Sequence, residues 1–250
     1  MKHSSTQEWE QEQAKISIII PALNEVDNIK NTIAAIGKAE NIEVIVVDGG
    51  SEDDTVATIQ SLDESFNIKS NIRVIQSARG RAVQMNAGAE VATGNILLFL
   101  HADTRLSANF DVMVRETLKN HYYIAGAFTL RIDAPMLSLR LVELGVKLRS
   151  HILQLPYGDQ GIFVRKSTFS KVNGFPEIPI MEDFEFISQL KKLGKVTTLP
   201  LPVITSARRW LKKGVIQTTL INQIVIAAFF LGVSPEKIRK WYRQGKLRLF

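Results

Sequence analysis

Four short, largely apolar runs alternate with segments of helical spacing in the first hundred residues, and this alternation limits the fold more than any other feature. The runs span residues 16–20, 44–47, 72–75 and 96–100. Between them, apolar side chains recur three or four positions apart, which is the period of an amphipathic helix. Strands and helices in this order predict an α/β fold with a mostly parallel central sheet and helices on both faces.

The second half of the chain mixes the two patterns. Strands are expected at residues 124–132, 161–165 and 196–199, helices at residues 135–153 and 182–193, and two further helices towards the C-terminus. Proline cannot donate to a sheet ladder, so Pro21 should end the first strand, and Pro200 and Pro202 should interrupt the last one. Pro235, after Ser234, is expected at the first position of the last helix.

These patterns suggest a simple domain organisation. Residues 1–14 form a polar tail that is expected to be disordered, residues 15–211 form one domain, and residues 212–250 form a helical appendage. A chain of 250 residues is long enough for one large α/β domain with a substantial core. No cysteine is present, which excludes disulfides and thiolate metal sites and favours a cytoplasmic protein.

The charge balance and one apolar C-terminal segment bear on the choice of partners. A formal net charge of +6 favours anionic ligands or surfaces. Residues 224–233 are too few for a membrane-spanning helix, which needs about 20 largely apolar residues. Basic residues flank this segment at Arg208, Arg209, Lys212, Lys213, Lys237, Arg239, Lys240 and Arg243. We favour a helix packed on the core, with peripheral contact at the inner face of a membrane as the alternative.

Polar loops follow the first two strands, at the end where an open α/β sheet binds its ligands. Residues 21–25 form either a plain strand-to-helix turn or one wall of a nucleotide pocket. In residues 48–51, Asp48 can accept a hydrogen bond from a base or a ribose, or it can satisfy the amides of its own turn. The candidate nucleotide-sugar contacts here are Pro21, Asn24, Glu25, Asp48, Gly49 and Ser51.

The loop after the fourth strand, residues 101–103, suits a metal-bound diphosphate. A divalent cation on a diphosphate needs few protein ligands, because phosphate oxygens and water supply the rest. Asp103, helped by His101, is therefore a candidate ligand for Mg²⁺ or Mn²⁺, and Ala102 is a candidate donor contact. The alternative for Asp103 is a cap on the following helix.

Basic and polar residues elsewhere offer further contacts. Arg79 and Arg81 lie at the start of an expected helix, and both guanidinium groups and helix N-termini favour phosphate, although a solvated basic turn is the alternative. The remaining candidates are Gln84 and Asn86 for the donor, Gly158, Asp159 and Gln160 for the acceptor, and Arg208, Arg209 and Trp210 for the acceptor or the diphosphate.

Two adjacent carboxylates, Glu182 and Asp183, open the helix expected at residues 182–193. A carboxylate here can deprotonate an acceptor hydroxyl, which is general-base chemistry. The alternative is a favourable negative charge at a helix N-terminus. The polar loops at the strand ends favour the catalytic interpretation.

Together these motifs resemble glycosyltransferase family 2 of the GT-A fold, over roughly residues 15–211. The similar segments are residues 21–25, 48–55, 101–103, 182–183 and 208–210. The third stands where the family carries its Asp-x-Asp metal motif, the fourth looks like its Glu-Asp motif, and the last resembles the end of its Gln-x-x-Arg-Trp motif. Residues 79–86 and 158–160 look like a subgroup of small bacterial members.

The resemblance implies a Rossmann-like, nucleotide-sugar-binding fold and an inverting, metal-dependent transfer of a sugar to an acceptor hydroxyl. The apolar C-terminal segment and its basic flanks suit a lipid acceptor, and a small molecule is the alternative. It also implies Asp183 as the base and Asp103 as the metal ligand. The chain departs from the family in carrying His101 at the first position of the metal motif, and in lacking the Gln of the last motif.

Two other functions fit a nucleotide-binding α/β layout. A nucleotidyltransferase usually shows a glycine-rich phosphate loop after the first strand, and residues 21–25 contain no glycine. A nucleotide-sugar-binding protein without catalysis, held at a membrane surface, would need no working base. Nucleic-acid binding is not expected, because the basic residues are spread along the chain without an aromatic-basic module.

Overall fold

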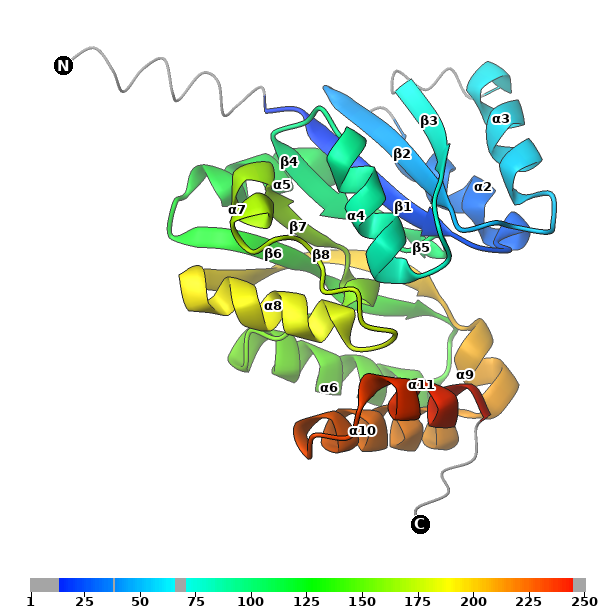
Figure 1. Ribbon diagram of the computed structural model, residues 1–250, viewed down its shortest axis with the longest axis vertical. Coiled ribbons are helices and arrows are strands. Elements are labelled where there is room, and N and C mark those ends of the chain that lie inside the picture. The colour runs from blue at the N-terminus through cyan, green and yellow to red at the C-terminus, as the bar shows by residue number, and fades with distance from the viewer. Residues whose placement is uncertain (1–13, 38, 66–70, 245–250) are drawn as a thin grey trace.

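The computed structural model describes residues 14–37, 39–65 and 71–244, and one eight-stranded sheet forms its centre (Figure 1). The strand order is β3-β2-β1-β4-β7-β6-β8-β5. The strands are β1 Ile16–Ala22, β2 Ile42–Asp48, β3 Asn71–Gln76, β4 Ile96–Phe99, β5 Thr104–Arg105, β6 Tyr123–Asp133, β7 Ile162–Arg165 and β8 Lys195–Ser206. Most of the tail expected at residues 1–14 lies outside the described residues.

The sheet is parallel on one side and mixed on the other. β3, β2, β1 and β4 pair in parallel, whereas β7 runs antiparallel to both of its neighbours, β4 and β6. β6 and β8 are parallel to each other, and the short β5 pairs antiparallel with β8. All strands of this sheet except β5 and β7 therefore point the same way, and the predicted mostly parallel sheet is confirmed.

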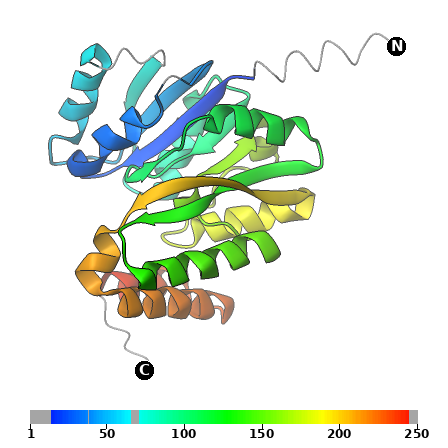
Figure 2. The same cartoon turned by 180° about the vertical axis from the view of Figure 1, so that it is seen from behind.

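Helices cover both faces of the sheet, as the sequence predicts (Figure 1 and Figure 2). They are α2 Val26–Ala34, α3 Thr55–Ser65, α4 Arg81–Val91, α5 Phe110–Lys119, α6 Leu137–Ile152, α7 Lys166–Lys171, α8 Glu182–Leu193, α9 Arg208–Lys213, α10 Val215–Phe230 and α11 Pro235–Gln244. Among the residues that the structure describes, no helix has both the length and the apolar character needed to cross a bilayer.

β1 shows why the apolar runs form the centre of the molecule. All seven of its residues are buried. Ile18 and Ile20 pack into one apolar cluster with Ile29 of α2, whereas Ile19 packs with Met85 of α4 into a second cluster on the other face. Alternate residues of a strand point to opposite faces, so a strand that is covered by helices on both faces needs a continuous apolar run.

The predicted end of the last strand is wrong. β8 does not stop before Pro200 but runs through both prolines to the end of the strand. Its pairing with β6 steps from Leu199 opposite Phe128 to Pro202 opposite Thr129, so that Pro200 and Leu201 lie in a β-bulge without residues opposite them. A bulge leaves the extra residue unpaired, and a residue without an amide hydrogen is therefore tolerated there.

The first strand also continues past its proline. β1 pairs with β2 through Pro21, but its pairing with β4 ends at Ile19. The Ile19 carbonyl accepts from Leu100 N at 3.0 Å, and Pro21, two residues further along, faces the same side of the strand. The missing amide hydrogen of Pro21 thus points past the end of β4, where no ladder bond is required.

The C-terminal part contains three helices rather than the expected two. The short α9 is separated from α10 by Gly214, whose φ of 84° turns the chain between them. A positive φ of this size favours glycine. Pro235 opens α11, as predicted.

Candidate functional site

The loops after β1 and β2 meet at the carboxyl ends of these strands and are tied to each other. Gly49 N donates to Ala22 O at 2.9 Å. Asn24 N donates to Ser51 Oγ at 3.0 Å, and Asn24 Oδ1 accepts from Glu52 N at 2.8 Å. Asn24 has a left-handed φ of 55°, a conformation that asparagine tolerates better than most residues. The predicted donor contacts of these loops therefore form one connected surface.

Asp48, at the end of β2, closes its own turn. Its side chain is buried, and Oδ2 accepts from Gly50 N and from Ser51 N, both at 3.1 Å. These are the bonds of a carboxylate that satisfies turn amides. Contact between Asp48 and a nucleoside stays a prediction, and such a contact has to form beside these bonds.

Gln84 and Asn86, two residues predicted to contact the donor, bind backbone groups instead of facing open space. Gln84 Nε2 donates to the carbonyls of Ala22 and Val47, both at 2.8 Å, and thereby joins β1 to β2. The Asn86 amide exchanges two hydrogen bonds of 2.9 Å with the backbone of Phe175. Gln84 thus holds the ends of β1 and β2 together beneath the two loops, and Asn86 is not brought to these loops.

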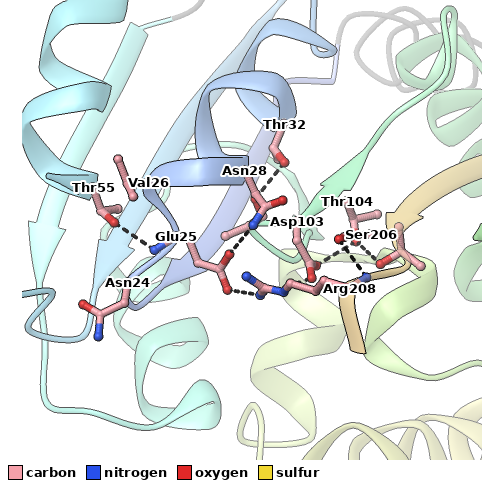
Figure 3. A network of polar contacts seen from close by, with 12 residues as sticks. Asn24, Glu25, Val26, Asn28, Thr32, Thr55, Asp103, Thr104, Ser206 and Arg208 are labelled. Atoms are coloured by element: carbon pink, nitrogen blue, oxygen red, sulfur yellow. Dashed lines mark hydrogen bonds and ion pairs between the residues drawn. The ribbon is translucent and has the colours of Figure 1, made fainter. Parts of the chain in front are cut away.

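Arg208, at the start of α9, links two predicted site residues. Its Nη2 atom forms an ion pair with Glu25 Oε1 and lies 3.3 Å from Asp103 Oδ2 (Figure 3). Asn28 Nδ2 donates to the second Glu25 oxygen at 2.9 Å. Burial raises the pKa of Asp103, while the Arg208 charge opposes that rise. One guanidinium thus bridges two carboxylates from loops that are far apart in the sequence.

These two carboxylates are the part of the site that fits a metal ion. Within residues 14–37, 39–65 and 71–244, no group of three or more His, Cys, Asp or Glu side chains is arranged to hold a metal. Asp103 and Glu25 nevertheless converge on one positive charge, and both offer the hard oxygen ligands that Mg²⁺ and Mn²⁺ prefer. The set is complete only if a diphosphate and water supply the remaining ligands. Ala102 takes a structural part, since its carbonyl accepts from Thr32 Oγ1 at 2.7 Å.

Asp183 lies at the first turn of α8 with both oxygens bonded to backbone amides. Oδ2 accepts from Gly158 N and Oδ1 from Phe184 N, both at 2.8 Å. A Cβ atom on Gly158 would lie 2.9 Å from His101 Nε2 and 3.3 Å from Asp183 Oδ2. Glycine at this position therefore lets the imidazole and the carboxylate approach the same short segment. The residue before α8, Met181, has a left-handed φ of 68°, which is uncommon for a non-glycine residue.

His101 lies beside Gly158 and within the electrostatic influence of Asp183 and Arg81. Burial and the nearby Arg81 charge lower the pKa of His101 to about 4, against the opposing effect of Asp183. The imidazole is therefore neutral at pH 7. Asp103 forms an ion pair with a different residue, Arg208, so the two predicted metal residues have different surroundings.

Glu182 anchors α8 to the donor side. Its Oε1 atom lies 2.6 Å from Arg81 Nε, at the start of α4. The side chain is 3% exposed, and Oε2 has no hydrogen-bond partner. Burial raises the pKa of Glu182, and the Arg81 charge opposes that rise. The pair joins the helix that carries Asp183 to the helix that follows β3.

Asp159 is the least satisfied carboxylate of the group. Its Oδ1 atom is buried without a hydrogen-bond partner. Burial raises its pKa to about 6, with the Arg149 charge opposing the rise and the Asp183 charge adding to it. Arg149 of α6 also stacks on the Tyr157 ring, with its Cζ atom 3.4 Å from the ring centroid.

The other predicted residues are divided between the protein surface and its interior. Gln160 is fully buried, and its Nε2 atom donates to Phe128 O at 2.9 Å. Arg79 is half-exposed and pairs with Glu52 at 3.8 Å. Arg209 stacks on the Tyr242 ring at 4.1 Å, and Trp210 packs against the core with its Nε1 atom unpaired. In the described part of the chain, none of these four side chains forms a hydrogen bond or an ion pair with Asp103 or Asp183.

Sequence reasoning missed Tyr157 and Arg149 as members of the site. Tyr157 lies directly before the predicted segment Gly158–Gln160, and its N atom donates to Gln160 Oε1 at 3.3 Å. Arg149 Nη2 donates to the same oxygen at 3.1 Å. The adjacency of Tyr157 to the loop was a usable signal, whereas Arg149 lies on a helix whose packing the sequence does not reveal.

Comparison of the sequence with known proteins identifies its relatives. The sequence model of glycosyl transferase family 2 matches residues 17–169. An uncharacterized glycosyltransferase of Bacillus subtilis (strain 168), YfnE, is 27% identical over 187 residues, which cover 72% of this chain and 46% of the relative. Dolichol-phosphate mannosyltransferase of Pyrococcus furiosus is 30% identical over 114 residues, 44% of this chain and 32% of the relative. The chain thus spans less than half the length of these curated relatives.

Solved structures share the fold. Mannosyltransferase PcManGT from Pyrobaculum calidifontis, in complex with GDP-Man and Mn²⁺, superposes with a TM-score of 0.64 at 16% identity, covering 97% of this chain and 77% of that one. Staphylococcus aureus TarS 1–349 in complex with UDP gives a TM-score of 0.62 at 18% identity, covering 77% of this chain and 60% of that one. These likenesses confirm the predicted GT-A fold class.

Proposed function

The chain belongs to glycosyl transferase family 2, and on this basis we propose that it transfers a sugar from a nucleotide-sugar donor to an acceptor hydroxyl. The observation that carries the proposal is the position of Asp183. Its carboxylate bonds to Gly158 beside His101, and His101 belongs to the loop that follows β4. The candidate base therefore faces the edge of the sheet at which the donor loops end.

In the proposed reaction Asp183 acts as the general base. The acceptor oxygen bonds to the anomeric carbon while the bond from that carbon to the diphosphate breaks, and Asp183 takes the hydroxyl proton. This single displacement inverts the anomeric configuration. Two backbone amides hold the Asp183 carboxylate in place, so little reorientation is needed before it accepts the proton.

The donor is proposed to lie over the loops after β1, β2 and β4. Solved structures with this fold carry UDP, UDP-GlcNAc, or GDP-Man with Mn²⁺, which supports a nucleoside diphosphate sugar here. Asp103 and Glu25 would hold Mg²⁺ or Mn²⁺, and the ion would offset charge on the departing diphosphate. Arg208 forms ion pairs with both carboxylates. We propose that its guanidinium moves to the diphosphate when the donor binds.

The acceptor is proposed to be a lipid or a small molecule with a free hydroxyl. Support for a lipid comes from the Pyrococcus furiosus relative, whose name includes dolichol phosphate. The Asp159 oxygen without a partner, next to Gly158, is the polar group best placed to bind such a molecule. Action in the cytoplasm, with or without contact at the inner membrane face, stays a prediction.

A thermal-unfolding screen tests the donor site. Wild-type protein is melted with UDP, GDP, dTDP and their sugars, with and without Mn²⁺. A ligand that binds only the folded state, and is present at 100 times its Kd, raises the free energy of unfolding by about 2.7 kcal/mol. We expect one nucleotide to give a shift that Mn²⁺ enlarges, and Asp103→Asn to remove the enlargement.

The matched control for this screen is Asp133→Asn. Asp133 is a neighbouring exposed carboxylate that pairs with Arg105 at 2.5 Å, so the substitution removes the same charge without touching the proposed metal ligands. If no nucleotide shifts the wild-type unfolding curve, or if Asp103→Asn behaves like the control, the proposed donor site is wrong.

A further inference from the structure

α10 exposes large apolar side chains beside its buried face. Ile221, Val225 and Ala228 are buried in a cluster with Phe184 of α8 and Ile238 of α11. Outside this cluster, α10 exposes Ile216, Leu220, Phe230 and the following Leu231, which are between 56% and 83% exposed, together with Gln217 and Gln223. Groups of large exposed apolar side chains normally mark a site that a partner or a lipid covers. The exposed apolar side chains of α10 therefore indicate a binding surface.

α6 exposes a second apolar stripe. Its exposed residues Leu137, Leu141, Leu144, Leu148 and Ile152 recur at helical spacing and are between 51% and 83% exposed. Residues spaced by three and four positions share one face of a helix. The opposite face packs on the sheet through the buried Leu139 and the partly buried Val142 and Val146. The helix is thus apolar on its inner and its outer face.

The two stripes belong to neighbouring helices. α6 and α10 contact each other, and they lie side by side along the lower edge of the molecule in both views (Figure 1 and Figure 2). We call the nine exposed side chains of both stripes the α6–α10 surface: Leu137, Leu141, Leu144, Leu148, Ile152, Ile216, Leu220, Phe230 and Leu231. Soluble monomeric domains rarely expose so many large apolar side chains together, and such surfaces mark interaction sites.

The exposed charges on α6 and on the neighbouring helices α9 and α11 are mostly positive. Exposed cations lie on α6 at Lys147, on α9 at Lys212, and on α11 at Lys237, Arg239 and Lys240. α10 itself carries no charged residue, and Glu236 is the exposed acid of α11. A positive rim attracts an anionic surface and repels a second rim of the same charge, so it favours anionic lipid over a second copy of this chain.

We propose that the α6–α10 surface docks the protein on an anionic lipid bilayer, with the apolar stripes at the level of the acyl chains and the cations at the headgroups. Apolar stripes beside lysine and arginine are the features by which helices bind in the plane of a membrane interface. This docking is a property of the surface itself and does not depend on the proposed sugar transfer.

The surface adjoins the candidate catalytic segment. Phe230 of α10 contacts Phe184, the residue after Asp183, with ring centroids 5.2 Å apart. Arg149 of α6 stacks on Tyr157, the residue before Gly158. Both helices of the surface therefore touch the segments that carry the candidate base and the acceptor loop, so docking would bring these segments close to the bilayer.

Vesicle co-sedimentation of the full chain tests the proposal. Wild-type protein is mixed with vesicles of phosphatidylcholine alone or with 30% phosphatidylglycerol (about one anionic lipid in three, an ordinary anionic surface). We expect sedimentation with the anionic vesicles that weakens with rising salt. Leu141→Gln with Leu148→Gln should reduce the bound fraction by about ten-fold, because two apolar anchors are lost.

The control pair is Val91→Gln with Val112→Gln, two exposed helix residues outside the surface. It should bind like wild type, and a second pair on α10, Ile216→Gln with Leu220→Gln, should lose binding like the α6 pair. Circular dichroism confirms that each variant is folded. The proposal would be overturned if all variants sedimented with anionic vesicles to the same extent. It would also be overturned if wild-type protein bound neither kind of vesicle.

Sedimentation velocity of the same proteins without lipid separates docking from self-association. We expect wild type and variants to sediment alike, as monomers. A wild-type dimer that the α6 pair converts to a monomer would assign this surface to a second copy of the chain, and it would overturn the proposal of lipid docking.

Discussion

The loops after β1 and β2 are closed by their own hydrogen bonds, whereas the segment Tyr157–Asp159 and the start of α8 keep buried polar atoms without partners. On the donor side, Asp48 and Gln84 have backbone partners. On the acceptor side, Asp159 Oδ1 and Glu182 Oε2 have none. An unpaired buried oxygen destabilises the fold by about 1–3 kcal/mol. The proposed donor side is thus closed by its own hydrogen bonds, whereas the proposed acceptor side retains buried oxygens without a partner.

This difference gives the two sides different sensitivities. A substitution in the donor loops should lower stability and donor affinity together, because the same bonds support both. A substitution on the acceptor side should alter turnover or pH dependence with a smaller effect on donor binding. Four predictions test this division.

The largest effect is expected from Gly158→Ala. The new Cβ atom would lie 2.9 Å from His101 Nε2 and 3.3 Å from Asp183 Oδ2, so one of these side chains must move. Misplacing a catalytic group by about 1 Å can cost on the order of a hundred-fold in rate. We expect kcat to fall by that order with donor Kd unchanged, measured by steady-state kinetics and calorimetry.

The control for this prediction is Gly145→Ala, at an exposed position of α6 where an added Cβ meets nothing within 4 Å. It should keep full activity and gain about 0.5–1 kcal/mol of stability, since alanine is the better helix former. A Gly158→Ala enzyme with wild-type kcat would contradict the proposal that the segment around Gly158 positions the catalytic group.

Arg81→Ala should have the next largest effect. It leaves the Glu182 carboxylate buried without its ion-pair partner, which we expect to lower the free energy of unfolding by about 2–3 kcal/mol. The double variant Arg81→Ala with Glu182→Gln should recover part of this loss, because the uncompensated charge is gone. Denaturant unfolding of the three proteins measures the recovery, and additive losses would contradict the pairing.

Gln84→Ala and Asn86→Ala compare a residue under the donor loops with a residue that is not brought to them. Each removes two hydrogen bonds to the backbone, and we expect each to cost about 1–2 kcal/mol of stability. Gln84→Ala alone should also weaken donor binding several-fold, because it frees the ends of β1 and β2. Equal donor affinities in the two variants would argue against a donor side held by its own hydrogen bonds.

The smallest effect is a pH dependence from Asp159. Its pKa is raised to about 6 in the folded protein, chiefly by burial, and is about 3.9 in an unfolded chain. The folded state therefore binds more protons than the unfolded state between these values, so this carboxyl makes stability fall as pH rises from about 4 to 6. Asp159→Asn should remove that fall, as thermal unfolding at pH 4, 5, 6 and 7 would show.

The contrast between the two sides also explains what the sequence could predict. Apolar runs that end in polar loops predicted the central strands and the Asp48 and Asp103 loops, because strand and loop are local in the chain. The path of β8 through Pro200 was not predictable, since the bulge depends on its pairing with β6. Residue type suggested Gln84 as a ligand contact, but the packing of α4 directs its amide to two carbonyls.

The acceptor side was harder to predict, because it is assembled from distant segments. Glu182 and Asp183 were visible as a carboxylate pair at a helix start, and the structure places them with Arg81 and Gly158. The stacking of Arg149 on Tyr157 depends on how α6 packs, and no local pattern reports it.

The most direct measurement compares Asp183→Asn with Glu185→Gln. Both remove one negative charge from the first turn of α8, but only Asp183 bonds to Gly158. With the donor identified by the thermal screen, we expect Asp183→Asn to bind it with wild-type affinity and to lose about 10²–10⁴-fold in transfer rate, while Glu185→Gln keeps both. Transfer by Asp183→Asn at the wild-type rate would contradict the assignment of Asp183 as the base.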